Sequence, residues 1–298
     1  MPQQIERRTQ ADLVLAVVCF VWGSTFIIVK QAVADISILL FLTIRFSIAA
    51  LLLAILFALR KKRPPVGEGL RGGIIAGVLL FTGYVVQTFG LRYTTAAKTG
   101  FVTGLYIPLV PILGALIYRK KPQLAETLGI VLAFTGTALM TVPKDMSIGK
   151  GDLLVACSTV AYALHILVLA RYSKTADVGW LAVVQIATAA LLGWLIFWWA
   201  APVEVRWTRA VWIGLGVTSV LATAFAFSAL TWAQKYTTAT HAALILSLEP
   251  VFAWLASYVA AGEVLSGRGI AGAGLILSGI ALAELKPFGV AGHPSLKR

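Results

Sequence analysis

Charged residues are scarce in this chain: they make up 12% of its 298 residues, whereas hydrophobic residues make up 59%. Because a soluble globular domain usually carries about 25% charged residues, this composition excludes an ordinary soluble fold. Cysteine is scarcer still, and the two cysteines, Cys19 and Cys157, lie inside apolar stretches. We expect both to be small buried residues and not a disulfide or a metal-binding pair.

Several signatures of chemistry are missing as well. No phosphate-binding loop of the form Gly-x-x-x-x-Gly-Lys-Ser/Thr occurs, which argues against ATP-driven work, and no His or Cys cluster has metal-ligand spacing. No serine or cysteine lies beside an obvious base, so we expect neither an enzyme nor a bound cofactor. The first apolar run ends at Lys30 without an Ala-x-Ala cleavage site, and we expect it to remain as a helix.

Long apolar stretches are what the sequence has in abundance. A helix needs roughly 20 apolar residues to cross the hydrocarbon core of a bilayer. Ten stretches come close to or exceed that length, at residues 13–30, 37–59, 70–91, 94–118, 125–142, 152–171, 178–200, 210–233, 238–261 and 267–285. The predicted fold class is therefore an all-α integral membrane protein with ten transmembrane helices and no soluble domain.

The second five stretches look like a copy of the first five. Residues 93–96, with the sequence Tyr-Thr-Thr-Ala, recur as residues 236–239, at an offset close to half the length of the chain. We therefore divide the chain into a first five-helix repeat at residues 1–146 and a second at residues 147–298. Because five is odd, the two repeats must enter the membrane from opposite sides, which is the inverted-repeat architecture of many secondary transporters.

Glycines gather in the fifth and tenth stretches. Gly129 and Gly136 of the fifth stretch correspond, at the same offset as the Tyr-Thr-Thr-Ala repeat, to Gly272 and Gly279 of the tenth. Small residues let helix backbones approach closely in lipid. Since these stretches carry almost no central polar groups, we assign both to packing and not to a substrate path.

The net charge of +13 is unevenly distributed. Basic clusters such as residues 60–63 and 119–121 fall on alternate connections, and the intervening connections hold fewer bases. The positive-inside rule then predicts that both termini lie in the cytoplasm. We interpret the clusters as contacts with anionic membrane lipid and not as a nucleic-acid site.

One acid and one base lie deep inside apolar stretches. Glu249 is about halfway along the ninth stretch, where a charge costs roughly 2.5–3.5 kcal/mol unless it is paired or hydrated. It either binds a substrate ammonium group, carries a coupling proton, or packs as a neutral or ion-paired residue. Arg45, in the second stretch, either holds a substrate carboxylate or is a fixed structural fork that pairs with Glu249 or with a carbonyl.

Other polar and aromatic side chains fall on single faces of the predicted helices. In lipid such faces turn toward protein or water, so each residue either lines a path or bonds to another helix. The further candidates to line a substrate path are Trp22, Tyr84, Gln87, Thr99, Thr103, Tyr106, Tyr162, His165 and Gln185. His241, which opens the ninth stretch near the membrane surface, is a weaker candidate.

Prolines and acids mark breaks and ends of the predicted helices. Pro108, Pro111 and Pro250 lie well inside apolar stretches, where they act either as hinges beside the substrate or as static kinks. Asp12 and Asp152 lie where apolar stretches begin, and we expect both to be caps that favour a helix N-terminus.

These features together resemble the EamA-type branch of the drug/metabolite transporter superfamily. The residues that carry the resemblance are Trp22-Gly23-Ser24 with Lys30, Arg45, the two Tyr-Thr-Thr-Ala openings, Pro108, Glu249-Pro250 and Gly262-Glu263. The resemblance covers essentially the whole chain. It implies a ten-helix carrier of a bacterial inner membrane, in which helices one to four and six to nine surround a central cavity. The nearest relatives it implies are exporters of amino acids, aromatic or otherwise neutral.

Two interpretations of the substrate stay open. An acid, a base, hydroxyl groups and aromatic rings suit a zwitterionic amino acid. The same residues, with Glu249 attracting positive charge, suit cationic aromatic compounds and hence multidrug or other metabolite efflux. A structural or receptor protein would not require polar stripes at mid-membrane depth. The sequence leaves open whether the protein is a monomer or a homodimer.

Overall fold

The computed structural model describes residues 2–59, 66–119, 123–141, 148–197, 204–261 and 266–284. Within these ranges the regular structure is helical, and extended pairing is limited to an isolated bridge between Ile36 and Val205. Eight helical segments are long and apolar enough to cross a membrane, and two shorter apolar helices accompany them. The chain is therefore an all-α, multi-pass membrane protein, as the composition predicted.

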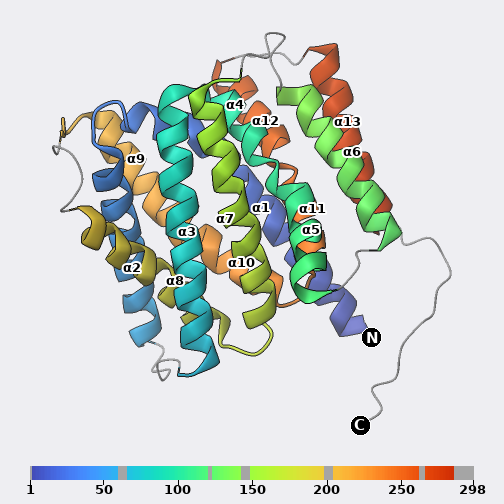
Figure 1. Ribbon diagram of the computed structural model, residues 1–298, viewed down its shortest axis with the longest axis horizontal. Helices are drawn as coiled ribbons and strands as arrows, with labels where there is room; N and C mark the ends of the chain where they lie inside the picture. Colours follow the sequence, from blue (N-terminus) through green and yellow to red (C-terminus); the bar gives the residue numbers. More distant parts are fainter. Residues whose placement is uncertain are drawn as a thin grey trace.

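The helices follow one another as shown in Figure 1. Their bounds are α1 (Pro2–Ala32), α2 (Ile38–Leu59), α3 (Glu68–Tyr93), α4 (Ala96–Thr103), α5 (Tyr106–Tyr118), α6 (Leu124–Thr141), α7 (Lys150–Tyr172), α8 (Val178–Phe197), α9 (Arg209–Ser219), the π-helix η1 (Val220–Phe225), α10 (Ala226–Gln234), α11 (Ala239–Leu246), α12 (Glu249–Ala261) and α13 (Gly267–Glu284). Each predicted stretch coincides with helical residues, although the predicted ends at 142, 198–200 and 285 lie outside the described residues, as do the basic residues 60–63, 120–121 and the pair 262–263.

The pattern of helices repeats along the chain. The lengths of α4, α5 and α6, at 8, 13 and 18 residues, recur in the same order in α11, α12 and α13. A short break follows the first helix of each set, at Gly104–Leu105 and at Ser247–Leu248. The Tyr-Thr-Thr-Ala repeat seen in the sequence is thus part of a longer regularity that covers three consecutive helices.

The two breaks show where two of the three prolines lie, and the prediction that the prolines act as hinges stays a prediction. Pro108 and Pro250 lie in the first turns of α5 and α12, after the breaks, where a proline fits because its missing N–H is not needed. Pro111 is the proline inside a helix, in α5. The helices are therefore interrupted just before the prolines, and Pro108 and Pro250 begin new helices instead of kinking continuous ones.

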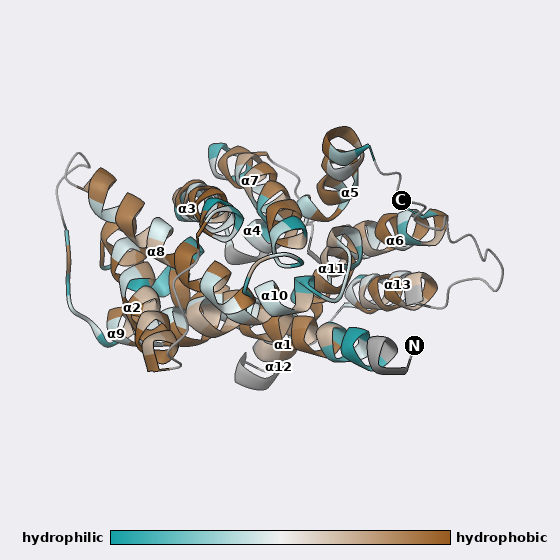
Figure 2. Ribbon diagram, turned by 90° about the horizontal axis from the view of Figure 1, so that it is seen from below, coloured by the Kyte–Doolittle hydropathy of each residue, from teal (hydrophilic) through white to brown (hydrophobic). Residues whose placement is uncertain are grey.

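The outer surface of the bundle is apolar, as contact with lipid requires. Leu51, Leu116 and Leu191 are 63%, 72% and 70% exposed, which would be costly for large hydrophobic residues in water. Figure 2 shows hydrophobic ribbon along the outward faces of the helices. Cys157 belongs to this exposed surface, so the expectation that both cysteines are buried is wrong for Cys157 and confirmed for Cys19.

Helices α6 and α13 pack side by side at one edge of the bundle, as both ribbon views show. A methyl group on Gly129 would overlap the carbonyl oxygen of Gly279, and one on Gly136 would overlap that of Gly272. Such backbone contact is available to glycine because it has no side chain. The predicted packing role of these glycines is confirmed, and neither helix contributes to the cavity described next.

Candidate functional site

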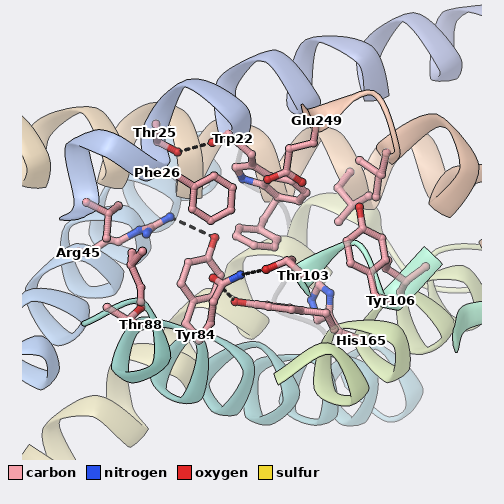
Figure 3. Close-up of a pocket in the computed structure, with 18 residues that line it drawn as sticks. Trp22, Thr25, Phe26, Arg45, Tyr84, Thr88, Thr103, Tyr106, His165 and Glu249 are labelled. Atoms are coloured by element: carbon pink, nitrogen blue, oxygen red, sulfur yellow. Dashed lines mark hydrogen bonds between the residues drawn. The ribbon is translucent and has the colours of Figure 1, made fainter. Parts of the chain in front are cut away.

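A cavity lies in the middle of the bundle, between the long helices and the short helices α4 and α11 (Figure 3). We call α4 and α11 half-helices, because each ends at one of the two breaks. It contains about 760 Å³ of empty space, part of which is continuous with solvent, and the centre of a water-sized sphere can occupy about 80 Å³ of it. The lining residues are Trp22, Thr25, Phe26, Val29, Arg45, Tyr84, Gln87, Thr88, Leu91, Thr103, Tyr106, Tyr162, His165, Ile166, Phe227, Leu230, Leu246 and Glu249. The wall is therefore largely aromatic and aliphatic, with a few polar groups.

Most side chains proposed from the sequence meet at this cavity. Those in its wall are Trp22, Arg45, Tyr84, Gln87, Thr103, Tyr106, Tyr162, His165 and Glu249. Two candidates, Thr99 and Gln185, are fully buried outside the wall. The cavity is thus lined by residues from both halves of the sequence. The spacing of residues along single helices could not show that these residues lie together.

Glu249 is the acid in the wall of the cavity. It is the first residue of α12, directly after the break at Ser247–Leu248, and Figure 3 shows its side chain reaching into the cavity beside Trp22. Among the described residues its carboxylate has no hydrogen-bond or ion-pair partner. The break explains its position, because an interrupted helix lets a polar residue at mid-depth face a cavity instead of lipid.

Arg45 is held by the protein on one side and faces the cavity on the other. Its Nε donates to Thr223 Oγ1 at 2.7 Å, and its Nη2 donates to the Tyr84 hydroxyl at 3.2 Å and to the Ala222 carbonyl at 3.4 Å. The guanidinium carbon lies 4.5 Å from the centre of the Tyr84 ring. Within the described residues Nη1 has no partner. Of the two partners considered from the sequence, a carbonyl is confirmed by Ala222, and Glu249 does not pair with Arg45.

The π-helix η1 is the element that Arg45 supports. Thr223 Oγ1 donates to the carbonyl of Thr218, five residues earlier, at 2.7 Å. The indole N–H of Trp22 donates to the Ala222 carbonyl at 3.0 Å, the same oxygen that Arg45 contacts. Such π-bulges widen a helix locally and occur frequently at functional sites. Trp22 and Arg45 therefore both line the cavity and satisfy polar groups that the bulge exposes.

A second polar network fastens α4 to its neighbours. Gln87 donates from Nε2 to Thr103 Oγ1 at 2.8 Å, and the Tyr162 hydroxyl donates to Gln87 Oε1 at 2.9 Å. These bonds join α3, α4 and α7 at the wall of the cavity (Figure 3). Because both ends of the Gln87 amide are used, the wall keeps its shape without a ligand.

The two candidates outside the wall have local partners. Gln185 Oε1 lies 2.8 Å from His165 Nε2, and Gln185 Nε2 donates to Thr231 Oγ1 at 2.9 Å, so Gln185 orients the His165 ring from behind. Thr99 donates to the carbonyl of Thr95 at 2.9 Å, within its own half-helix. Neither arrangement supports direct contact with a substrate.

The aromatic residue at the centre of the wall, Phe227, was not among the residues predicted from the sequence. The Phe227 ring lies 5.2 Å from Trp22, 6.0 Å from Tyr84 and 5.7 Å from His165, measured between ring centres. Phe26, one helical turn beyond Trp22, also lines the cavity, and that spacing was a usable signal. Phe227 had no such signal, because the preceding π-helix changes the register of the α10 face.

The cavity can hold a small molecule that has an apolar or aromatic body and a positively charged group. The unpartnered Glu249 carboxylate attracts positive charge, and the surrounding rings add cation–π attraction. Arg45 Nη1 offers a donor for a carboxylate. Among the described residues no group of three or more His, Cys, Asp or Glu side chains is placed to hold a metal ion.

Comparison with known proteins identifies relatives of the whole chain. The sequence profile of the EamA-like transporter family matches residues 9–142 and again residues 149–285. An uncharacterized transporter of Archaeoglobus fulgidus is 35% identical over 286 residues, covering 94% of this chain and 87% of that protein. The uncharacterized transporter YoaV of Bacillus subtilis is 27% identical, covering 88% and 92%. A crystal structure with a TM-score of 0.78 covers 93% of this chain and 97% of its own at 18% identity, and so shows the fold alone.

Proposed function

This chain belongs to the EamA-like transporter family, and on that premise we propose that it is a secondary transporter that exports small metabolites, foremost amino acids with aromatic or other neutral side chains. The proposal rests mainly on the unpartnered Glu249 carboxylate, which lies in a cavity lined by aromatic and aliphatic side chains at the middle of the bundle. An ammonium group beside Glu249 would compensate the cost of an isolated acid at that depth. The apolar side chain would then contact the rings of Trp22, Phe227 and Tyr84.

The proposed architecture is ten membrane crossings in two inverted five-helix repeats, at residues 1–146 and 147–298. Three observations support it: the family profile matches twice, the lengths of three consecutive helices recur in the second half, and the shorter helices α6 and α13 are apolar and pack together. Inverted repeats permit alternating access, because the two halves can exchange conformations. With both termini in the cytoplasm of a bacterial inner membrane, opening toward the opposite side releases the substrate.

Efflux of organic cations is the second candidate function. The hydrogen bonds of Arg45 favour it. Because Nε and Nη2 are bonded to Thr223, Tyr84 and Ala222, only Nη1 is left for a substrate carboxylate. A cation without a carboxylate would need Glu249 and the rings but not Arg45.

Phenylalanine and phenethylamine separate the two candidates, because they differ only by the carboxylate. In counterflow assays with purified protein in liposomes, an amino-acid exporter exchanges labelled phenylalanine in preference to phenethylamine, and a cation exporter does the reverse. Exchange of neither compound by folded protein would remove both substrate classes.

Glu249→Gln tests directly whether the charge of the Glu249 carboxylate binds the substrate. The substitution keeps the size of the side chain but removes its charge, so we expect exchange of either amine to fall at least tenfold. Glu68→Gln is the matched control, because Glu68 is an exposed acid at the start of α3, outside the cavity. Equal exchange by Glu249→Gln and the parent protein would exclude Glu249 from substrate binding.

A further inference from the structure

Two acid–base pairs connect the half-helices to the long helices. Lys98 Nζ lies 3.5 Å from Asp152 Oδ2 and joins α4 to α7. His241 Nε2 lies 3.1 Å from Asp12 Oδ1 and joins α11 to α1, while Arg8 Nη2 lies 3.5 Å from His241 Nδ1. Asp12 is therefore not the helix cap expected from the sequence, because it lies well inside α1 and pairs with another helix.

The two pairs occupy equivalent positions in the repeat. Lys98 is the third residue of α4, and His241 is the third residue of α11. The two acids also match: the number of residues from Asp12 to the start of α2 equals the number from Asp152 to the start of α8. The two bases also make the same backbone contact. In α4, the backbone N–H of Lys98 donates to Oγ1 of the capping residue Thr95 at 3.1 Å.

The second half-helix has the same cap, since the backbone N–H of His241 donates to Thr238 Oγ1 at 3.1 Å. A basic side chain in the first turn of a helix faces the positive end of the helix dipole, which disfavours it. Helix capping therefore does not explain Lys98 or His241, whereas pairing with an acid does. The side chains are mostly shielded, at 20% and 10% exposure for Lys98 and Asp152, so the pairs are not ordinary surface salt bridges.

The pairs lie at opposite ends of the bundle. Lys30, near the end of α1, donates to the Thr94 carbonyl, and Thr94 Oγ1 donates to Asp152 Oδ1 at 2.5 Å. Lys30 and Asp12 lie on the same helix, and at a rise of about 1.5 Å per residue they are about 27 Å apart along its axis. That separation is close to the hydrocarbon thickness of a bilayer, about 30 Å. In Figure 1, α4 begins at the upper end of the bundle, whereas the N-terminus lies at the lower end.

Each half-helix runs from a pair near one end of the bundle to the wall of the cavity. α4 is eight residues long, or about 12 Å, and ends at Thr103, which is bonded to Gln87. α11 is also eight residues long and ends at Leu246 in the cavity wall, just before the break and Glu249. A short rigid helix with a break at its inner end can tilt as a unit, so a ligand at Glu249 and the outer pair act on the same element.

We propose that the Lys98–Asp152 and His241–Asp12 pairs are the two gates of the transport cycle. Each pair holds a half-helix against a long helix and closes one side of the cavity, and each opens while the other stays closed. We name the side at which α4 begins the α4 face, and the side at which α11 begins the α11 face. The inference rests on the proposed transport function, but its test does not depend on the substrate.

The test measures access to the cavity from each face. In a background with Cys19→Ala and Cys157→Ser, the buried wall residue Thr88 is replaced by cysteine and exposed to a membrane-impermeant thiol reagent in liposomes of either orientation. Asp152→Asn leaves the charge of Lys98 uncompensated, and Asp12→Asn removes the carboxylate that contacts His241, so each substitution weakens one closed state. We expect Asp152→Asn to raise labelling severalfold from the α4 face and lower it from the α11 face, and Asp12→Asn to do the reverse.

Asp35→Asn is the matched control, because Arg206, its partner at 3.0 Å, is 77% exposed, and neither residue lines the central cavity. It should change labelling from neither face. Labelling that changes in the same direction from both faces, or not at all, in folded Asp152→Asn and Asp12→Asn proteins would overturn the proposal.

A cross-link covers the case in which these variants fold poorly. Cysteines at Lys98 and Asp152, joined by a short bifunctional thiol reagent with a cleavable link, should block labelling of the Thr88 position from the α4 face until the link is cleaved. Unchanged labelling after complete cross-linking would overturn the gate. Reciprocal labelling in a protein that exchanges neither phenylalanine nor phenethylamine would uphold the gates and reject the proposed substrates.

Discussion

Arg45 has two tasks, and the structural one can be measured separately. Its Nε and Nη2 hold Thr223, Ala222 and Tyr84 together, and a lysine ammonium group cannot reproduce that planar fork. Arg45 thus acts as a fixed support for η1 even if its remaining nitrogen binds substrate.

We expect Arg45→Lys to lower the free energy of unfolding by about 1–3 kcal/mol, because buried acceptors lose their donors. The measurement is the midpoint of thermal unfolding of the purified protein in detergent. Arg206→Lys is the control: its side chain is 77% exposed, and its ion pair should contribute little. Equal unfolding midpoints for the two variants would show that the Arg45 bonds do not stabilise η1.

Single residues were predictable from the sequence where their placement is costly. Glu249 and Arg45 stood out because a charge inside an apolar stretch needs a reason, and both line the cavity. Gln185 and Thr99 were placed on the correct helices, but periodicity does not distinguish a side chain that faces a cavity from one that bonds to a neighbouring helix. Phe227 was missed because nothing in one sequence marks a π-helix.

Among the elements, the α6–α13 pair should act as a packing unit only. Gly272→Val places a branched side chain against the backbone of α6, so we expect a lower midpoint of thermal unfolding. Gly274→Val lies on the same helix with open space around it and should leave the midpoint nearly unchanged, which separates packing from helix propensity. Equal destabilisation by both substitutions would contradict the packing account.

The interrupted helices were only partly predictable. The prolines showed that the fourth and ninth stretches contain an irregularity, yet the breaks precede Pro108 and Pro250 and consist of Gly104–Leu105 and Ser247–Leu248. A leucine or serine does not end a helix by propensity alone. The contacts that α4 and α11 make with other helices, among them the pairs with α7 and α1, cannot be read from one sequence.

The molecule as a whole has recurring helix lengths in its two halves but unequal side chains at the cavity. Glu249 begins α12 at the position where Tyr106 begins α5, so only one repeat brings an acid to the cavity. α3 is a continuous helix, whereas the corresponding segment of the second repeat contains η1. The recurring helix lengths were predictable because the sequence itself repeats, and the inverted two-repeat layout stays a proposal. The unequal side chains at the cavity were not predictable, because one sequence does not show which residues of the two halves come into contact.

The inverted arrangement of the two repeats is the central claim, and topology labelling tests it most directly. Gln31, near the end of α1, and Lys174, after α7, are both exposed. Single cysteines at these two positions are treated, in sealed membranes of known orientation, with an impermeant thiol reagent. We expect Gln31→Cys to react from one side and Lys174→Cys only from the other. Reaction of both cysteines from the same side would contradict it.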